Sequence, residues 1–401
     1  MKILVVNIGS TSFKYHLFDM DKEDILARGT IERVGNCQSP MKYVGNGGKA
    51  INKSIDTSSG YDGCIKSMIE ILLDREAGVI GDLVDIDAVG FKTAHGGEIR
   101  EPSPITEKVI KTMEEYSGIV PAHNPPYINA IKRFQELLPK TPLVAVFETY
   151  FHKEIPDYAY LYSIPFEWYE KYNIRKYGFH GASHRFVSER VSAITHRPLE
   201  ELKLISCHLG GSSSISAIKH GKSIDNSMGF SCQAGIPMSK RCGDIDPFII
   251  PFVMEKGKLS FREVMDALVQ SSGLLGISGL SSDIRDLEEK AASDNYRAKL
   301  ALEVFAYSIK KYIGGYIAIM GGLDVLVFTG GIGENSPTVR RMACDKMEYL
   351  GIELDADRNE CKGVECVISK DASRVEVLVI PPNEEVIVAR ETLKVLGEKQ
   401  S

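Results

Sequence analysis

The chain has 401 residues, more than one ordinary domain holds, so two domains are the default expectation. Hydrophobic residues make up 43% and charged residues 25%, the balance of a soluble globular protein. The formal net charge is −6 and no apolar stretch reaches the length of a membrane span, so we expect neither a nucleic-acid partner nor a membrane. The chain starts with an apolar strand, and we expect no signal peptide. The eight cysteines form no C-x-x-C pair, and we expect reduced thiols in a cytoplasmic protein.

The N-terminus has the pattern strand, turn, strand. Residues 2–6 are apolar, 7–12 carry glycine and hydroxyl side chains, and 13–18 alternate apolar with polar residues as a half-buried strand does. The same pattern returns in residues 202–219, where His208 to Ser214 form the turn. This weak internal repeat predicts two related halves.

A third glycine-rich turn, Thr329 to Asn335, follows a buried strand over 324–328. Ser336 and Pro337 then predict the cap and the first position of a helix. Other helices are predicted over residues 62–76, 105–116, 124–138, 183–194, 261–270, 294–319 and 383–396. Strands that alternate with helices predict an α/β protein, and we place the domain division near residue 150.

Glycine-rich turns at strand ends expose backbone amides that can hold phosphate oxygens. The first two turns are not P-loops, since no G-x-x-x-x-G-K-[ST] occurs, and a strand instead of a helix follows each. Lys14 beside the first turn is equally compatible with phosphate binding and with a solvated strand position. The third turn precedes a helix N-terminus, which favours anions. Together the turns predict an enzyme that handles phosphate.

Histidines stand in loop positions at His95, His123 and His180. A structural role is favoured for any one histidine, and His184 is expected to have that role at the start of its helix. Arg241 lies beside Gly243-Asp244, where a surface turn with local ion pairs is the plain interpretation. A planar guanidinium can also bridge two phosphate oxygens, which makes Arg241 a functional candidate.

These motifs together resemble the acetate kinase family. The resemblance runs from Lys2 to about Lys394 and rests on these segments: Asn7-Ile8-Gly9-Ser10-Thr11-Ser12-Phe13-Lys14, His95-Gly96-Gly97-Glu98, Val146-Phe147-Glu148-Thr149, Tyr177-Gly178-Phe179-His180-Gly181, Cys207-His208-Leu209-Gly210, Gly243-Asp244-Ile245-Asp246-Pro247, Ser282-Asp283-Ile284-Arg285 and Phe328-Thr329-Gly330-Gly331-Ile332-Gly333-Glu334-Asn335.

The resemblance implies the actin–hexokinase–sugar kinase fold, with two related α/β domains that close on a cleft, and a homodimer. Residues 1–150 with a C-terminal helix at about 384–401 would form the acyl and phosphate side. Residues 151–383 would form the nucleotide-binding domain. The implied reaction is reversible, direct in-line transfer between ATP and a short-chain carboxylate, which gives ADP and an acyl phosphate.

The resemblance also implies roles for individual residues. Asn7 and Glu384 would hold Mg²⁺ or Mn²⁺, and Glu148, His180 and Arg241 would be catalytic. Phosphate and nucleotide contacts would come from Ser10, Ser12, Lys14, His208, Gly210, Gly211, Asp283, Ile284, Arg285, Gly330, Gly331, Ile332, Gly333 and Asn335. The carboxylate would be bound by Lys92, Ala94, Ala122, His123 and Cys232.

Departures from the family pattern concentrate on the acyl side. Lys92 stands where the family has arginine, Glu148 where it has aspartate, and Gly211 where it has asparagine. Ala94, Ala122 and Cys232 replace a larger valine, leucine and proline around the acyl group, which predicts a group larger than acetate. A non-catalytic nucleotide-binding paralogue is the main alternative, and an ATPase or sugar kinase is a weaker one.

Overall fold

The computed structural model describes residues 1–9, 11–45, 47–48 and 50–397. The chain divides into two compact units, Met1–Tyr150 with Asn383–Ser401, and Phe151–Pro382. Each unit has its own sheet, so the molecule is an α/β protein as the sequence predicts. No helix in the described part of the chain is long and apolar enough to cross a membrane.

The first unit is built on an eight-stranded sheet with the order β5-β4-β3-β2-β1-β6-β8-β7. Its strands are β1 (Lys2–Ile8), β2 (Ser12–Asp19), β3 (Asp24–Glu32), β4 (Ser39–Gly45), β5 (Ala50–Ile55), β6 (Ala88–Thr93), β7 (Ser103–Pro104) and β8 (Leu143–Phe147). Its helices are α1 (Tyr61–Leu72), α2 (Glu107–Glu115), α3 (Asn124–Leu137) and α14 (Glu384–Gly397), with a 3₁₀ turn over Leu83–Asp85. The strands β1, β6 and β8 run parallel, and their carboxyl ends therefore meet at one edge of the sheet.

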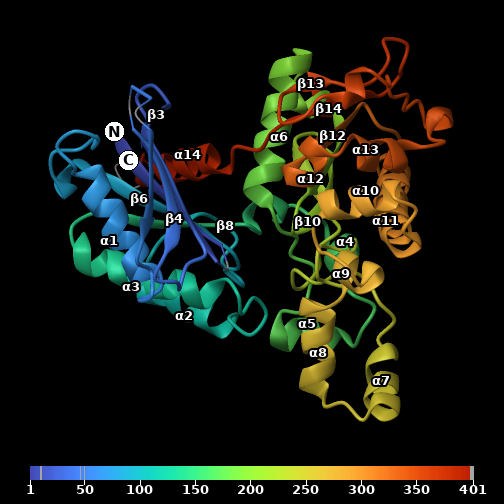
Figure 1. Ribbon diagram of the computed structural model, residues 1–401, viewed down its shortest axis with the longest axis horizontal. Coiled ribbons are helices and arrows are strands. Elements are labelled where there is room, and N and C mark those ends of the chain that lie inside the picture. Colours follow the sequence, from blue (N-terminus) through green and yellow to red (C-terminus); the bar gives the residue numbers. More distant parts are fainter. Residues whose placement is uncertain (10, 46, 49, 398–401) are drawn as a thin grey trace. The chain divides into compact units, whose positions relative to one another are not determined.

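The helix α14 returns from the end of the chain to pack on this sheet, as Figure 1 shows for the red helix beside the blue strands. The approach is close because β6 carries Gly90 at the contact. A Cβ atom at Gly90 would lie 2.3 Å from Thr392 Oγ1, which no real side chain tolerates. Glycine at this position therefore lets α14 pack closely on β6 at Val388 and Thr392.

The second unit is built on a six-stranded sheet with the order β11-β10-β9-β12-β14-β13. Its strands are β9 (Lys203–Leu209), β10 (Ser213–Lys219), β11 (Lys222–Asn226), β12 (Val325–Thr329), β13 (Cys366–Val367) and β14 (Glu376–Val379). Its helices are α4 (Asp157–Tyr160), α5 (Phe166–Tyr172), α6 (Gly181–Thr195), α7 (Ile249–Gly257), α8 (Phe261–Gln270), α9 (Gly273–Ser278), α10 (Ile284–Ala292), α11 (Tyr296–Met320), α12 (Gly330–Asn335) and α13 (Pro337–Cys344). The 3₁₀ turns are Tyr150–His152, Leu199–Glu201, Glu348–Leu350 and Arg358–Glu360.

The predicted internal repeat is confirmed by the strand orders. The run β3-β2-β1-β6-β8 has the same directions as β11-β10-β9-β12-β14, with an antiparallel hairpin joined to parallel strands. In the second unit α6 covers one face of the sheet, where Val187 and Val191 pack with Leu204 and Val327. The helices α10, α11 and α13 cover the other face.

The third glycine-rich turn differs from the prediction. Gly330–Asn335 forms the short helix α12 directly after β12. The predicted helix that begins at Pro337 is therefore a second helix, α13. Gly330 has φ of 77°, and a Cβ atom there would lie 2.7 Å from the Leu209 carbonyl oxygen. Only glycine allows this bend. The predicted cap at Ser336 is confirmed, because its hydroxyl accepts a hydrogen bond from the Val339 amide in α13.

Candidate functional sites

A charged cluster lies at the carboxyl edge of the first sheet. Lys92 comes from β6, Glu148 directly follows β8, and Glu384 is the first residue of α14. The Lys92 ammonium forms an ion pair with the Glu384 carboxylate and lies 3.7 Å from Glu148 Oε1. The side chains of Lys92, Glu148 and Glu384 are only 12%, 11% and 14% exposed. Three predicted site residues from distant parts of the sequence therefore form one buried ionic group.

Burial determines the electrostatics of this cluster. It raises the pKa of Glu148 to about 7, although Lys92 beside it acts in the opposite direction. Burial alone would lower the pKa of Lys92, but Glu148 and Glu384 prevail and raise it above its ordinary value. Neither carboxylate oxygen of Glu148 accepts a hydrogen bond from another described residue. Glu148 therefore keeps two buried acceptor atoms available.

The donor set beside Lys92 suits a hard divalent cation. Asn7 lies at the end of β1, where its Nδ2 donates a 3.1 Å hydrogen bond to Glu385 Oε1. Its Oδ1 lies 3.5 Å from the Tyr127 hydroxyl, which also accepts the Ile8 amide at 2.8 Å. Carboxylate and amide oxygens are the protein ligands that Mg²⁺ prefers, commonly one or two beside substrate phosphates. The Glu148 oxygens, which accept no hydrogen bond from any described residue, fit such an ion together with Glu384 and Asn7.

The first glycine-rich turn lies next to Asn7. The Gly9 amide donates to the Ser12 carbonyl oxygen at 2.9 Å and closes the turn between β1 and β2. Lys14 is exposed and pairs directly with Asn7 across the two strands, so both side chains lie on the same face. Ser10 lies outside the described residues.

The predicted acyl-binding residues are distributed over both units. Ala94, after β6, is 7% exposed, whereas Ala122 is exposed in the loop before α3. His123 is half-buried at the N-terminal end of α3, where its amide donates to the Val120 carbonyl oxygen. Cys232 belongs to the second unit, where its carbonyl oxygen accepts from Arg241. The role of these residues in binding a carboxylate stays a prediction.

His180, His208 and Arg241 lie in the second unit. His180 has φ of 57° at the N-cap of α6, and its ring stacks on that of His208 with centroids 4.2 Å apart. Arg241 Nη1 donates to Ser212 Oγ at 3.1 Å and to the Cys232 carbonyl oxygen at 3.3 Å. Ser212 belongs to the second glycine-rich turn. The turn thus holds a guanidinium in a defined orientation, which suits the binding of phosphate oxygens.

A cavity of about 760 Å³ brings together most of the predicted nucleotide-binding residues. Its lining includes the predicted residues Gly210, Gly211, Asp283, Ile284, Arg285, Gly331, Ile332 and Asn335. Gly330 and Gly333 are not among the lining residues and instead shape the backbone behind the cavity. The size and the glycine-rich wall suit a nucleotide.

The Asp283 carboxylate caps α10 by accepting the Arg285 amide at 2.9 Å, and it also accepts a hydrogen bond from Arg285 Nε at 3.0 Å. The hydrogen bonds from the Arg285 side chain and then from its amide hold the pKa of Asp283 below its ordinary value. This pair is therefore ionised at neutral pH.

Sequence reasoning missed several residues around both sites. Ser239, Glu288 and Lys362 line the cavity, and Glu385 and Tyr127 contact Asn7. Ser282 had a signal, because it precedes Asp283 in a motif that carries the family resemblance. Lys362 had none, since it lies in an irregular loop outside every motif.

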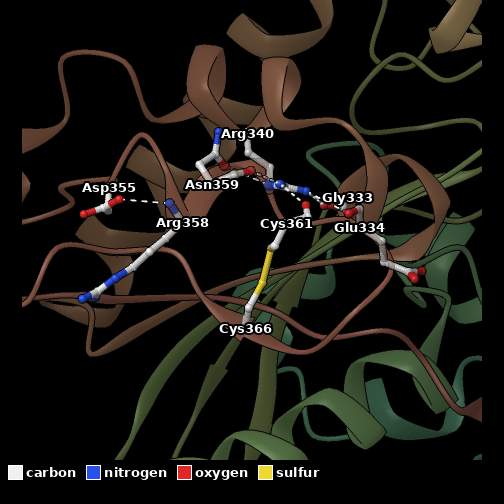
Figure 2. Close-up of a disulfide and its surroundings, with 8 residues drawn as sticks. All are labelled: Gly333, Glu334, Arg340, Asp355, Arg358, Asn359, Cys361 and Cys366. Atoms are coloured by element: carbon white, nitrogen blue, oxygen red, sulfur yellow. Dashed lines mark hydrogen bonds between the residues drawn. A yellow bond between two sulfur atoms is a disulfide. The ribbon is translucent and has the colours of Figure 1, made fainter.

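That loop also carries a disulfide between Cys361 and Cys366, shown in Figure 2. The expectation of reduced thiols is therefore wrong for this pair, because the loop folds back and brings together side chains five positions apart. The buried Arg340 ties the loop to α12. Its guanidinium donates to the carbonyl oxygens of Gly333, at 2.8 Å, and Cys361, at 2.8 Å. Lys362 is thus held next to the cavity.

Comparison with known proteins agrees with this arrangement. The model of the acetokinase family matches residues 2–390. The chain belongs to the acetokinase family. It is 48% identical to the acetate kinase of Caldanaerobacter subterraneus subsp. tengcongensis over 398 residues, 99% of each chain. The chain also resembles the crystal structure of Porphyromonas gingivalis acetate kinase, with 40% identity, a TM-score of 0.89, and coverage of 98% of this chain and 99% of that one.

A propionate kinase is also among the structural relatives of this chain. The crystal structure from Francisella tularensis subsp. tularensis has 34% identity and a TM-score of 0.90, and covers 98% of this chain and 99% of that one. The predicted family and fold are therefore confirmed, and carboxylate kinase activity is supported. These relatives are named for two different acids.

Proposed function

We propose that this protein reversibly transfers a phosphoryl group between ATP and a short-chain carboxylate, which gives ADP and an acyl phosphate. The observation that carries the proposal is the buried Lys92–Glu148–Glu384 cluster in the first unit of an acetokinase. A nucleotide-sized cavity in the second unit supports it. Under this proposal the first unit is the acyl and phosphate side, and the second unit binds the nucleotide.

In the first unit, Lys92 supplies positive charge for the carboxylate, and His123, Ala94 and Ala122 contact the acid. Asn7, Glu148 and Glu384 would hold Mg²⁺ or Mn²⁺. When bound, such an ion offsets the charge of the nucleotide phosphates. The Glu148 oxygens, which accept no hydrogen bond within the described part of the chain, would be ligands of that ion. Ser10, Ser12 and Lys14 contact phosphate.

In the second unit, Arg241 and His180 donate hydrogen bonds to the phosphoryl group during transfer. The carboxylate acceptor is already ionised at pH 7, so no strong base is needed, and the acid attacks the γ-phosphoryl group in line. Orientation and charge then supply most of the catalysis. Arg241→Ala should lower kcat about 100-fold or more while ATP affinity changes little. A near-normal kcat would remove Arg241 from the mechanism.

The acyl group is proposed to be larger than acetate. Ala94, Ala122 and Cys232 are smaller than the residues the family has there, and each methylene that fits changes discrimination by about 1–3 kcal/mol. We further propose that the protein is a cytoplasmic homodimer. The exposed apolar side chains of Phe248 at the N-cap of α7, Phe252 on α7 and Phe261 on α8 support an assembly, and light scattering tests it.

The alternative is a paralogue that binds nucleotide without catalysis. It is favoured by Gly211, which replaces an asparagine of the family. Against it, the replacements at Lys92 and Glu148 keep their charge, and both lie in the buried cluster. A sugar kinase or simple ATPase is disfavoured by the same cluster.

Trapping of the acyl phosphate with hydroxylamine tests the proposal. Purified protein with ATP, Mg²⁺ and acetate, propionate or butyrate should give hydroxamate that depends on both ATP and the acid. Calorimetric binding of ATP without hydroxamate from any acid would favour the non-catalytic alternative. ATP hydrolysis that is independent of added acid would favour an ATPase.

A further inference from the structure

Hydroxyl side chains line part of one face of the second sheet. Ser206 on β9 and Ser214 and Ser216 on β10 are all 0% exposed. The register pairs Ser214 with His208 and Ser216 with Ser206, so these side chains share one face. This is the face that α6 covers, and elsewhere it carries Leu204 and Val327. Strands buried on both faces are normally apolar, so the polar stretch needs a reason.

The serines connect to histidines of α6 in an unbroken path. His180 Nδ1 lies 2.8 Å from Ser214 Oγ, and the same oxygen lies 2.8 Å from His184 Nε2. His184 Nδ1 lies 2.9 Å from Ser206 Oγ. The path Ser206–His184–Ser214–His180 thus ends at a residue proposed to act on the phosphoryl group.

The hydroxyl of Ser206 determines which groups of the path donate hydrogen bonds and which accept them. Within the described part of the chain, its one hydrogen-bond partner is His184 Nδ1. If Ser206 accepted a hydrogen bond from His184 Nδ1, its own hydroxyl proton would be buried without an acceptor. Leaving a buried donor without a partner is energetically costly. Ser206 therefore donates to His184 Nδ1.

The remaining steps follow from counting protons. His184 stays neutral, since burial, with smaller effects from His152 and His208, holds its pKa well below the usual range. With Nδ1 as an acceptor, the one ring proton of His184 lies on Nε2 and is donated to Ser214. A hydroxyl has a single proton, so Ser214 donates its own to His180 Nδ1. A neutral His180 then carries its proton on Nε2.

We propose that Ser214, with His184 and Ser206 behind it, is a positioning residue that fixes His180 as the Nε2–H tautomer. His180 then acts as a neutral hydrogen-bond donor through Nε2, and Nδ1 is not available as a base. The contribution of that donor to catalysis rests on the proposed function, whereas the tautomer itself does not.

Nitrogen-15 NMR of histidine-labelled full-length protein tests the tautomer without any activity assay. Spectra are recorded above the usual titration range of histidine, and His180 and His184 are assigned from His180→Gln and His184→Gln. In the unsubstituted protein both rings should show a protonated Nε2 and a bare Nδ1. A protonated Nδ1 on either neutral ring would overturn the proposal.

Substitution then tests the link between the residues. In Ser214→Ala the Nδ1 atom of His180 loses its donor, so His180 should no longer be held as the Nε2–H tautomer and should show a partly protonated Nδ1. Ser223→Ala is the matched control, because Ser223 is equally buried but lies 2.7 Å from His152 Nδ1. It should leave His180 and His184 unchanged. Unaltered His180 signals in folded Ser214→Ala would contradict the positioning role of Ser214.

Catalysis provides a separate readout. If the proposed function is right, Ser214→Ala should lower kcat about tenfold with little change in the KM for ATP, as expected when one hydrogen bond of about 1–1.5 kcal/mol is lost. An Nε2–H tautomer in a protein that forms no acyl phosphate would refute the proposed function and leave the relay intact.

Discussion

The charged side chains of the two candidate sites differ in how deeply they are buried. In the first unit the ionic side chains of Lys92, Glu148 and Glu384 are only 11–14% exposed. In the second unit the side chains of Asp283 and Arg285, which line the proposed nucleotide cavity, are 37% and 83% exposed. Removing one member of a buried ion pair leaves an uncompensated charge, whereas exposed pairs contribute little to stability. Charge changes at the first site should therefore destabilise the protein. Charge changes at the second site should leave stability nearly unchanged but weaken ligand binding.

Lys92→Met should produce the largest effect. It leaves Glu148 and Glu384 buried without their cation, and breaking a buried pair costs about 3–5 kcal/mol. Urea unfolding measures this loss, and hydroxamate formation should fall with it. Lys132→Met is the control, because Lys132 pairs with Glu114 in the same unit but their side chains are 54% and 51% exposed. Equal destabilisation by the two variants would show that burial does not determine the cost of removing the cation from an ion pair.

Gly331→Asp should weaken ATP binding without unfolding the protein. The space around a Cβ atom at Gly331 is open, so the side chain can project into the cavity. A carboxylate near phosphate oxygens costs about 1–4 kcal/mol at short range, which predicts at least about fivefold weaker binding by calorimetry. Gly118→Asp, also in open space but in the first unit, should bind ATP normally. An unchanged ATP affinity in Gly331→Asp would show that the nucleotide does not bind in this cavity.

Glu148 should make stability depend on pH. Its carboxyl has a pKa of about 7 in the folded protein and of about 4.3 in the unfolded chain. The folded state therefore binds more protons between these values, so the free energy of unfolding should fall as the pH rises from about 4 to about 7. Glu148→Gln removes this contribution, and urea unfolding across that range should show a smaller decline. The same decline in both proteins would mean that Glu148 titrates normally.

Arg285→Ala should have the smallest effect on stability, less than about 1 kcal/mol, because its pair with Asp283 is exposed. ATP affinity should still fall, since Arg285 lines the cavity. A loss of stability as large as that of Lys92→Met would reverse the comparison between the sites.

Much of the fold could be predicted because its patterns are local. The hairpins β1–β2 and β9–β10 have apolar strands around glycine-rich turns, and the predicted helices over 124–138 and 261–270 correspond to α3 and α8. Helices such as α4, α9 and α12 were missed, because they have only four to six residues. A segment that short cannot show a helical period.

The sites were predictable in composition but not in geometry. The residues predicted to bind nucleotide come in short motifs, and most of them line one cavity. The contact between Lys92 and Glu384 joins residues 292 positions apart, and no local pattern reveals that an ammonium lies between two carboxylates. The hydroxyl path to His180 was likewise hidden, because Ser206 and Ser214 look like ordinary strand residues until the register is known.

The most direct test measures kcat/KM for acetate, propionate and butyrate with one enzyme preparation at saturating ATP. The proposed function, with small residues at Ala94, Ala122 and Cys232, predicts acyl phosphate formation, with propionate or butyrate preferred over acetate by about tenfold. If acetate is the best of the three acids, the larger acyl group is wrong. If ATP binds and none of them is phosphorylated, the proposed carboxylate kinase activity is contradicted.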